Sequence, residues 1–220
     1  MASVILVHGL WLPGPELFFL RRRLRAAGFR TYRFSYRSVA DDLDENAAQL
    51  AAFIAAKADE ELHLVGHSLG GIVILRMLEL SPQACSGRVM CLGSPLRSSV
   101  VGKAFATYPG GSALLGKSMA AFFAAGPMVR WSGTQDLGLI AGDSPLGLGQ
   151  LISALPSPHD GTVAVEETRL EGATEHIVLP VSHLSMLWSG VVAEQVVNFL
   201  SIGCFRRSSE SRYARPPGKS

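Results

Sequence analysis

The 220-residue sequence predicts an α/β fold in which helices cover both faces of a mainly parallel sheet. The first observation behind this prediction is that short, continuous apolar runs alternate along the chain with helical patterns. Strands covered on both faces have such runs, whereas half-buried strands alternate apolar and polar residues. The second is the composition: 48% of the residues are hydrophobic and 17% are charged, which excludes a disordered chain and suits one sizeable domain.

The first half of the chain supplies strands and helices in alternation. The apolar residues 4–7 predict a buried strand, and leucines at three- and four-residue spacing over 16–27 predict a helix. Aromatic residues alternate with polar ones over 30–36, which predicts a second strand. Acidic residues then favour the start of a helix over 41–54, because carboxylates stabilise the N-terminal end of the helix dipole.

The second half of the chain continues the pattern and then changes character. Strands are predicted at 61–65, 88–92, 137–141 and 176–179, and helices at 69–80 and 184–200. Residues 98–135 contain glycine and proline and show only a patchy helical pattern. From residue 203 onwards there is no apolar periodicity, so a domain over 1–202 is predicted to be followed by a disordered basic tail over 203–220.

The net charge of +2 is the sum of two unlike parts of the chain. Residues 203–220 carry five Lys or Arg and one Glu, whereas the preceding residues carry 15 basic and 17 acidic side chains. The predicted domain is therefore slightly acidic, and its charge gives no argument for an anionic substrate or for nucleic acid as a partner.

Several classes of protein are not supported by the sequence. The most apolar stretch, residues 113–128, is interrupted by Lys117, two glycines and a proline, so no transmembrane segment is predicted. The N-terminal residues predict a buried strand rather than a signal peptide. The three cysteines are not at zinc-ligand spacing, and an odd set in a chain of this size predicts a reducing, cytoplasmic location. No motif predicts a metal or another cofactor.

Ser68 is the candidate nucleophile. Residues 66–70 have the pattern Gly-x-Ser-x-Gly, with an apolar strand running into it and an apolar helix running out. Such a sharp strand-to-helix turn leaves the serine hydroxyl exposed on a strained backbone. The backbone N–H of the following residue, Leu69, is then placed to stabilise an oxyanion near the helix N-terminus.

A second motif, His8-Gly9-Leu10, follows the first predicted strand. An oxyanion hole needs a second N–H donor from a loop after an earlier strand, and this loop is suitably placed. With both motifs in this order, each directly after a strand, the sequence resembles compact bacterial lipases and esterases of the α/β-hydrolase superfamily. Those lipases have a strand ending in His-Gly and a later one ending in Gly-His-Ser-Leu-Gly-Gly, which residues 66–71 match.

The resemblance covers residues 3 to about 200 and implies an α/β-hydrolase fold. It makes Ser68 the nucleophile and the N–H groups of Leu10 and Leu69 the oxyanion donors. It also implies a small cap insertion at about 98–135. The sequence departs from the larger family members, which begin with additional antiparallel strands, so it resembles a minimal core.

His183 is the candidate base. The triad of this fold runs Ser, then Asp or Glu, then His along the chain, and His183 lies between the last predicted strand and the last helix. Asp160, in an Asp-Gly turn of a kind that these lipases often use for the acid, is favoured over Asp143, which directly follows the 137–141 strand. Other acidic side chains in this half are interpreted as solvated loop charges, namely Asp136, Glu166 and Glu167. His67, whose side chain points away from that of Ser68, is interpreted as structural.

Together these features predict a serine hydrolase that cleaves carboxylic esters through an acyl-enzyme on Ser68. The predicted partner is a small-molecule ester or lipid with an apolar acyl group. Trp11, which follows the oxyanion loop, and the apolar residues of 98–130 would line its pocket or simply belong to the core. The alternatives are a thioesterase, acyltransferase, amidase or perhydrolase of the same fold, or a binding or scaffold protein that has lost activity. The oligomeric state is left open.

Overall fold

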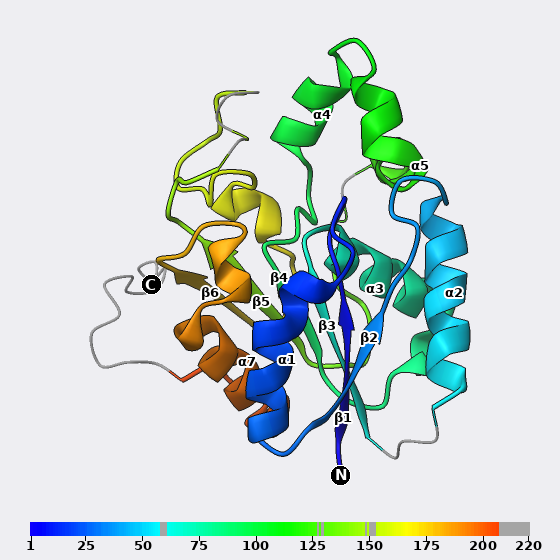
Figure 1. Ribbon diagram of the computed structural model, residues 1–220, viewed down its shortest axis with the longest axis vertical. Helices are drawn as coiled ribbons and strands as arrows, with labels where there is room; N and C mark the ends of the chain where they lie inside the picture. Colours follow the sequence, from blue (N-terminus) through cyan, green and yellow to red (C-terminus); the bar gives the residue numbers. More distant parts are fainter. Residues whose placement is uncertain (58–60, 127, 129, 148, 150–152, 207–220) are drawn as a thin grey trace, which may run out of the picture.

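The computed structural model describes residues 1–206 except 58–60, 127, 129, 148 and 150–152. It contains a six-stranded sheet in the order β2-β1-β3-β4-β5-β6, with every neighbouring pair parallel (Figure 1). The strands are β1 (Ser3–Val7), β2 (Arg30–Phe34), β3 (Leu62–His67), β4 (Val89–Leu92), β5 (Leu137–Gly142) and β6 (Glu175–Leu179). The mainly parallel α/β fold predicted from the sequence is confirmed.

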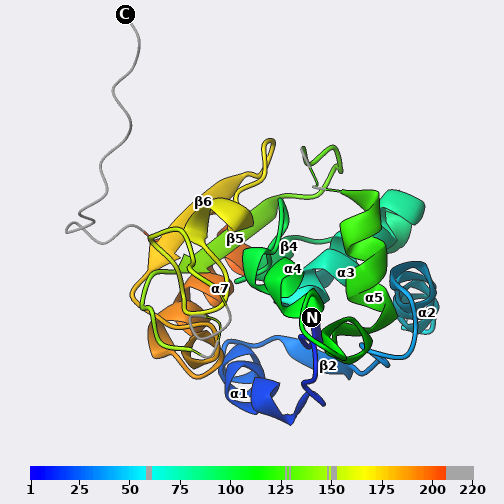
Figure 2. The ribbon, with the colours of Figure 1, turned by 90° about the horizontal axis from the view of Figure 1, so that it is seen from above.

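Helices cover the sheet on both faces, and the sheet separates the core into two apolar clusters. Figure 2 shows α1 (Phe18–Ala26) and α7 (Gly190–Ile202) on one side, and α2 (Leu43–Ala55) and α3 (Leu69–Leu80) on the other. Alternate residues of β1 enter the two clusters: Val4 and Leu6 pack with α1 and α7, and Ile5 and Val7 pack with α2 and α3. A strand buried on both faces needs the continuous apolar run seen in the sequence.

Two further helices, α4 (Val100–Ala106) and α5 (Gly111–Ala125), occupy the segment expected to form a cap. They connect β4 to β5 and lie beyond the carboxyl ends of the strands (Figure 1). The segment is not a separate layer throughout, because Leu115, Met119 and Phe122 of α5 are buried in the same apolar cluster as α2 and α3.

The last helix begins later than its apolar pattern predicts. The helix expected over 184–200 starts at Gly190, because the Ser189 side chain accepts a hydrogen bond from Val192 N–H and caps its N-terminus. Residues 185–187 form a short 3-10 helix, η4 (Ser185–Leu187), instead. In the part of the chain that the structure describes, no helix is long and apolar enough to cross a membrane.

The packed part of the chain extends beyond residue 202. Phe205 is buried, and its ring centroid lies 5.1 Å from that of Phe199. The Phe205 N–H donates to the carboxylate of Glu175 at the edge strand. Residues 203–206 thus pack on the domain, and the remaining residues of the predicted tail, 207–220, lie outside the described part.

Candidate active site

Ser68 lies at the turn between β3 and α3 in a conformation that few residues adopt. Its φ of 54° and ψ of −122° place it at positive φ, although it has a side chain. The flanking glycines allow the turn to pack. A Cβ on Gly66 would lie 2.5 Å from Gly71 N, and one on Gly70 would lie 2.3 Å from Val7 O. The structure therefore has the strained strand-turn-helix arrangement that the Gly-x-Ser-x-Gly motif predicts.

The loop after β1 passes directly beside Ser68. A Cβ built on Gly9 would lie 3.1 Å from Ser68 Cβ, which is closer than ordinary Cβ contacts, so glycine suits this approach of the two segments. Leu10 follows Gly9, and Leu69 is the first residue of α3, where N–H groups have no partner within the helix. Both predicted oxyanion donors thus belong to backbone segments next to Ser68.

His8 fixes this loop rather than serving as a second base. Its Nδ1 lies 2.9 Å from Gly9 O, and its Nε2 accepts from Tyr36 N–H at 3.3 Å. The Tyr36 hydroxyl donates to His8 O at 2.9 Å, and the two rings stack with centroids 4.4 Å apart. Burial lowers the pKa of His8, which favours the neutral ring that these contacts require.

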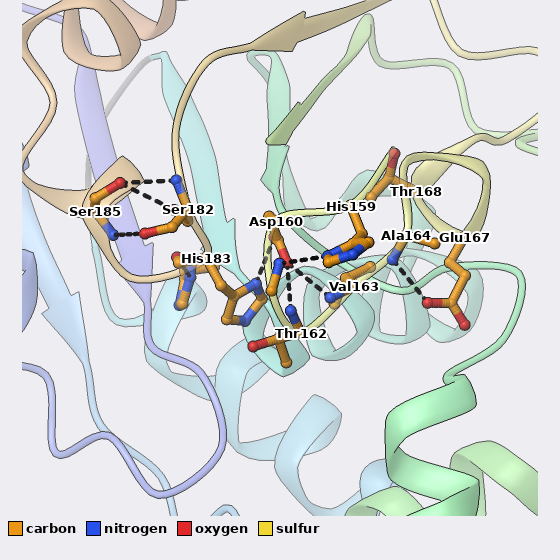
Figure 3. A network of polar contacts seen from close by, with 12 residues as sticks. His159, Asp160, Thr162, Val163, Ala164, Glu167, Thr168, Ser182, His183 and Ser185 are labelled. Atoms are coloured by element: carbon orange, nitrogen blue, oxygen red, sulfur yellow. Dashed lines mark hydrogen bonds and ion pairs between the residues drawn. The ribbon is translucent and has the colours of Figure 1, made fainter. Parts of the chain in front are cut away.

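Asp160 and His183 form a buried hydrogen-bonded pair (Figure 3). His183 Nδ1 lies 2.7 Å from Asp160 Oδ2, and the backbone N–H of His183 donates to Asp160 O at 2.9 Å. The other carboxylate oxygen, Oδ1, accepts from the backbone N–H groups of Thr162 at 2.9 Å and Val163 at 2.7 Å. Asp160 is 1% exposed and His183 is 7% exposed, so water scarcely competes for the pair.

The charge of Asp160 is favoured by its surroundings in spite of burial. Burial alone raises the pKa of this carboxyl group. The nearby His183 ring and the hydrogen bonds from His183, Val163 and Thr162 outweigh that effect, so the pKa lies below its ordinary value. A carboxylate kept ionised against Nδ1 fixes the orientation and the tautomer of the imidazole, and it leaves the other nitrogen, Nε2, outside this bond.

The structure joins His183 to Asp160 rather than to Asp143. Asp143 directly follows β5, and its backbone N–H donates to Leu179 O at 3.1 Å. His159, the residue before Asp160, is not a member of the Asp160–His183 pair. Its Nδ1 accepts from Gly161 N–H at 3.1 Å and stabilises the turn that carries Asp160. Among all the described residues, this site included, no three His, Cys, Asp or Glu side chains are grouped so that they could hold a metal ion.

The interpretation of Glu167 as a solvated loop charge is wrong. Glu167 is 5% exposed, and its carboxylate accepts from Val100 N–H at 2.7 Å, from Ala164 N–H at 2.9 Å and from the Ser98 hydroxyl at 3.1 Å. It therefore ties the start of α4 to the loop that carries Asp160. The sequence held no local sign of the bonds from Val100 and Ser98, because those two partners lie almost 70 residues away along the chain.

Trp11 connects the loop after β1 to the cap segment. Its indole N–H donates to Leu114 O at 2.7 Å, and its ring meets that of Phe105 edge-on with centroids 5.8 Å apart. It has a φ of 60° and remains 56% exposed. Part of the indole ring is thus available to a ligand beside the predicted oxyanion loop.

Comparison with known proteins fits this geometry. A family model described as the alpha/beta hydrolase family matches residues 4–194. The chain belongs to the alpha/beta hydrolase family. A search of curated proteins found no significant match to this hydrolase.

Solved structures similar to this alpha/beta hydrolase include three bacterial or metagenomic enzymes. The mature form of a Bacillus licheniformis lipase has a TM-score of 0.70 at 18% identity, over 93% of this chain and 92% of that one. A metagenomic carboxyl esterase has a TM-score of 0.67 at 15% identity, over 84% and 65%. A Bacillus subtilis carboxylesterase has a TM-score of 0.57 at 16% identity, over 92% and 84%. At these low identities, the likeness shows a shared fold and nothing more specific.

Proposed function

We propose that this hydrolase cleaves carboxylic esters through an acyl-enzyme on Ser68. The observation that carries the proposal is the buried Asp160–His183 pair, at the same end of the sheet as the strained turn that presents Ser68. Acyl transfer by a serine hydrolase needs three components. They are a serine that protrudes from such a turn, a histidine, and a carboxylate that is bonded to the Nδ1 atom of this histidine.

Each residue has a defined step in the proposed reaction. His183 Nε2 removes the proton of Ser68 Oγ as the oxygen attacks the ester carbonyl carbon. The N–H groups of Leu10 and Leu69 stabilise the tetrahedral oxyanion, each by about 3–4 kcal/mol if they resemble donors in other hydrolases. His183 then gives the proton to the leaving alcohol. A water molecule, deprotonated by the same ring, then attacks the acyl carbon, and His183 returns the proton to Ser68 Oγ as the bond between Ser68 and the acid breaks.

The proposed substrate is a small ester or lipid with an apolar acyl group. Exposed apolar side chains support this choice: Trp11 follows the oxyanion loop, and Tyr108 and Leu114 lie in the cap segment. The Trp11 contacts with Leu114 and Phe105 bring the two groups together. A largely apolar binding surface with few polar groups suits an acyl chain. Lipases and carboxylesterases among the similar folds agree with this choice.

A thioesterase, an acyltransferase or an amidase would use the same residues, so the leaving group is the property to test. Matched ester, thioester and amide substrates with the same acyl groups should be compared for the wild type and Ser68→Ala. We expect the wild type to prefer the ester, to prefer longer acyl chains over acetyl, and to lose turnover in Ser68→Ala. Turnover of the thioester or amide in preference to the ester would replace the proposed reaction. No turnover of any substrate would favour a binding role.

The cytoplasmic location belongs to the same proposal. Cys85, Cys91 and Cys204 form no disulfide in the structure. Burial raises the pKa of the Cys85 and Cys91 thiols to about 12, so neither thiol ionises to the reactive thiolate at neutral pH. Free thiols without a structural disulfide suit a reducing compartment.

A further inference from the structure

The side chain of His67 lies where the three loops of the candidate site meet. It is 1% exposed and immediately precedes Ser68. Its Nε2 lies 2.9 Å from the backbone oxygen of His183, and the two imidazole centroids are 4.8 Å apart. A Cβ built on Gly9 would lie 3.1 Å from His67 Nδ1. The ring therefore lies beside Gly9 of the loop after β1 and is hydrogen-bonded to His183 of the loop after β6, and the next residue in the chain is the candidate nucleophile.

The contacts define the protonation of His67. A carbonyl oxygen can only accept a hydrogen bond, so Nε2 must carry the proton and donate it to His183 O. Burial, with a smaller effect from nearby His183, lowers the pKa of His67 to about 3, so the ring is neutral at ordinary pH. Its Nδ1 is buried without a hydrogen-bond partner among the described residues.

This bond completes the attachment of His183. The carboxylate of Asp160 binds the Nδ1 atom of His183, and the main-chain oxygen of Asp160 accepts a hydrogen bond from the backbone N–H of His183. Those two bonds attach His183 to the acid loop, but they do not attach it to the strand that directly precedes Ser68. The bond from His67 Nε2–H to His183 O does so, because His67 is the last residue of β3.

We propose that His67 is a positioning residue, which sets the distance between the His183 ring and Ser68 by holding the His183 backbone to the nucleophile turn. The proposal rests on the proposed function and adds a role to a residue that the sequence marks only as structural. A cationic Lys or Arg could donate the same bond, but would place a charge against the ring that must accept a proton.

The test compares two variants of His67 with a matched control in the same strand. His67→Phe keeps a buried ring and loses the donor, whereas His67→Gln keeps an N–H group that can reach the same oxygen. His63 is the control, since it is also 1% exposed in β3, but its Nδ1 accepts from Arg88 N–H at 2.8 Å. Steady-state turnover, the unfolding midpoint and the rate of fluorophosphonate labelling are measured for each.

We expect His67→Phe to lower kcat and the labelling rate by about 10- to 100-fold with little change in KM, because a small displacement of a catalytic group is enough for such a loss. His67→Gln should retain most of the activity. His63→Phe should keep the wild-type kcat even where its unfolding midpoint falls. The proposal is overturned if His67→Phe has wild-type kcat, or if His67→Gln is as slow as His67→Phe.

A measurement on the unmodified protein separates this proposal from the proposed function. Nitrogen-15 spectra of the imidazoles should show His67 neutral at pH 7 with its proton on Nε2, and this signal needs neither activity nor a folded variant. A proton on Nδ1, or on both nitrogens, contradicts the positioning bond. A wild-type protein with the expected spectrum but no fluorophosphonate labelling would overturn the esterase proposal and leave the His67–His183 bond standing.

Discussion

At the scale of single residues, the choice of acid is the most specific consequence of the structure. Asp160→Asn should lower kcat by about 10⁴-fold, because the amide favours the wrong imidazole tautomer while the geometry survives. Asp143→Asn should stay within a few-fold of the wild type, since the His183 ring is bonded to Asp160. Steady-state assays of both variants decide the matter. An equal loss in Asp143→Asn would show that the acid is misassigned.

Two adjacent glutamates should differ sharply in their effect on stability. Glu167→Ala leaves the N–H groups of Val100 and Ala164 without their acceptor, and we expect a loss of about 2–4 kcal/mol in the free energy of unfolding. Glu166 is exposed and pairs with Arg97 and Arg169 at the surface, so Glu166→Ala should cost less than about 1 kcal/mol. Urea denaturation measures both, and similar losses would contradict the burial of Glu167.

The sequence predicts Ser68 and His183 as site residues because each lies next to a predicted strand end. It cannot choose between Asp143 and Asp160 in the same way. Asp143 follows β5 directly, but the chain returns to that strand end at Asp160, where a Cβ on Gly142 would lie 2.8 Å from Asp160 Cβ. Such a return depends on contacts between distant residues, and local periodicity does not record them.

At the scale of elements, the strand-turn-helix unit around Ser68 allows little variation. Gly70→Ala should abolish activity and destabilise the protein by about 3 kcal/mol or more, because its Cβ would collide with the backbone oxygens of Val7 and His8. Gly190→Ala is the control: the nearest atom to its Cβ is Arg23 Nη2 at 3.8 Å, at the first position of α7. It should keep full activity and gain up to about 1 kcal/mol.

Thermal unfolding and ester turnover of the two alanine variants test this contrast. A stable, active Gly70→Ala protein would mean that β1 and α3 do not approach as closely as the structure shows.

The elements most clearly predicted are those whose pattern is set by burial on the sheet. The helix over Leu69–Leu80 has the predicted bounds, and the strands lie close to theirs. The start of α7 is missed because apolar residues such as Leu184 and Trp188 continue the helical pattern, while the cap at Ser189 determines where the helix begins. Capping by one side chain outweighs apolar spacing at a helix end.

At the scale of the whole molecule, four buried or partly buried histidines make stability depend on pH in mild acid. The pKa values of His8, His63, His67 and His176 are all lowered by burial, to about 3 for His67 and about 4 for His176. As the pH falls below about 6.5, the unfolded chain takes up protons at these rings more readily than the folded protein does. Stability should therefore fall as the pH decreases from about 6.5 towards 4.

His176 provides a variant outside the candidate site for this test. Its Nε2 lies 2.9 Å from the hydroxyl of Thr168, a contact that the amide of Gln can make. From pH 6.5 to 5, His176→Gln should lose roughly 1.5 kcal/mol less of its unfolding free energy than the wild type. Denaturation curves at the two pH values give the comparison. Equal losses in the two proteins would show that His176 is protonated in the folded state.

The proposed reaction depends above all on Ser68 being an activated nucleophile. The most direct test is labelling with a fluorophosphonate probe, which reacts with a serine only when a base and an oxyanion hole activate it. We predict that the wild type is labelled once, at Ser68, that His183→Ala is labelled far more slowly, and that Ser68→Ala is not labelled. A wild-type protein that stays unlabelled, or a Ser68→Ala protein labelled as well as the wild type, would contradict the account.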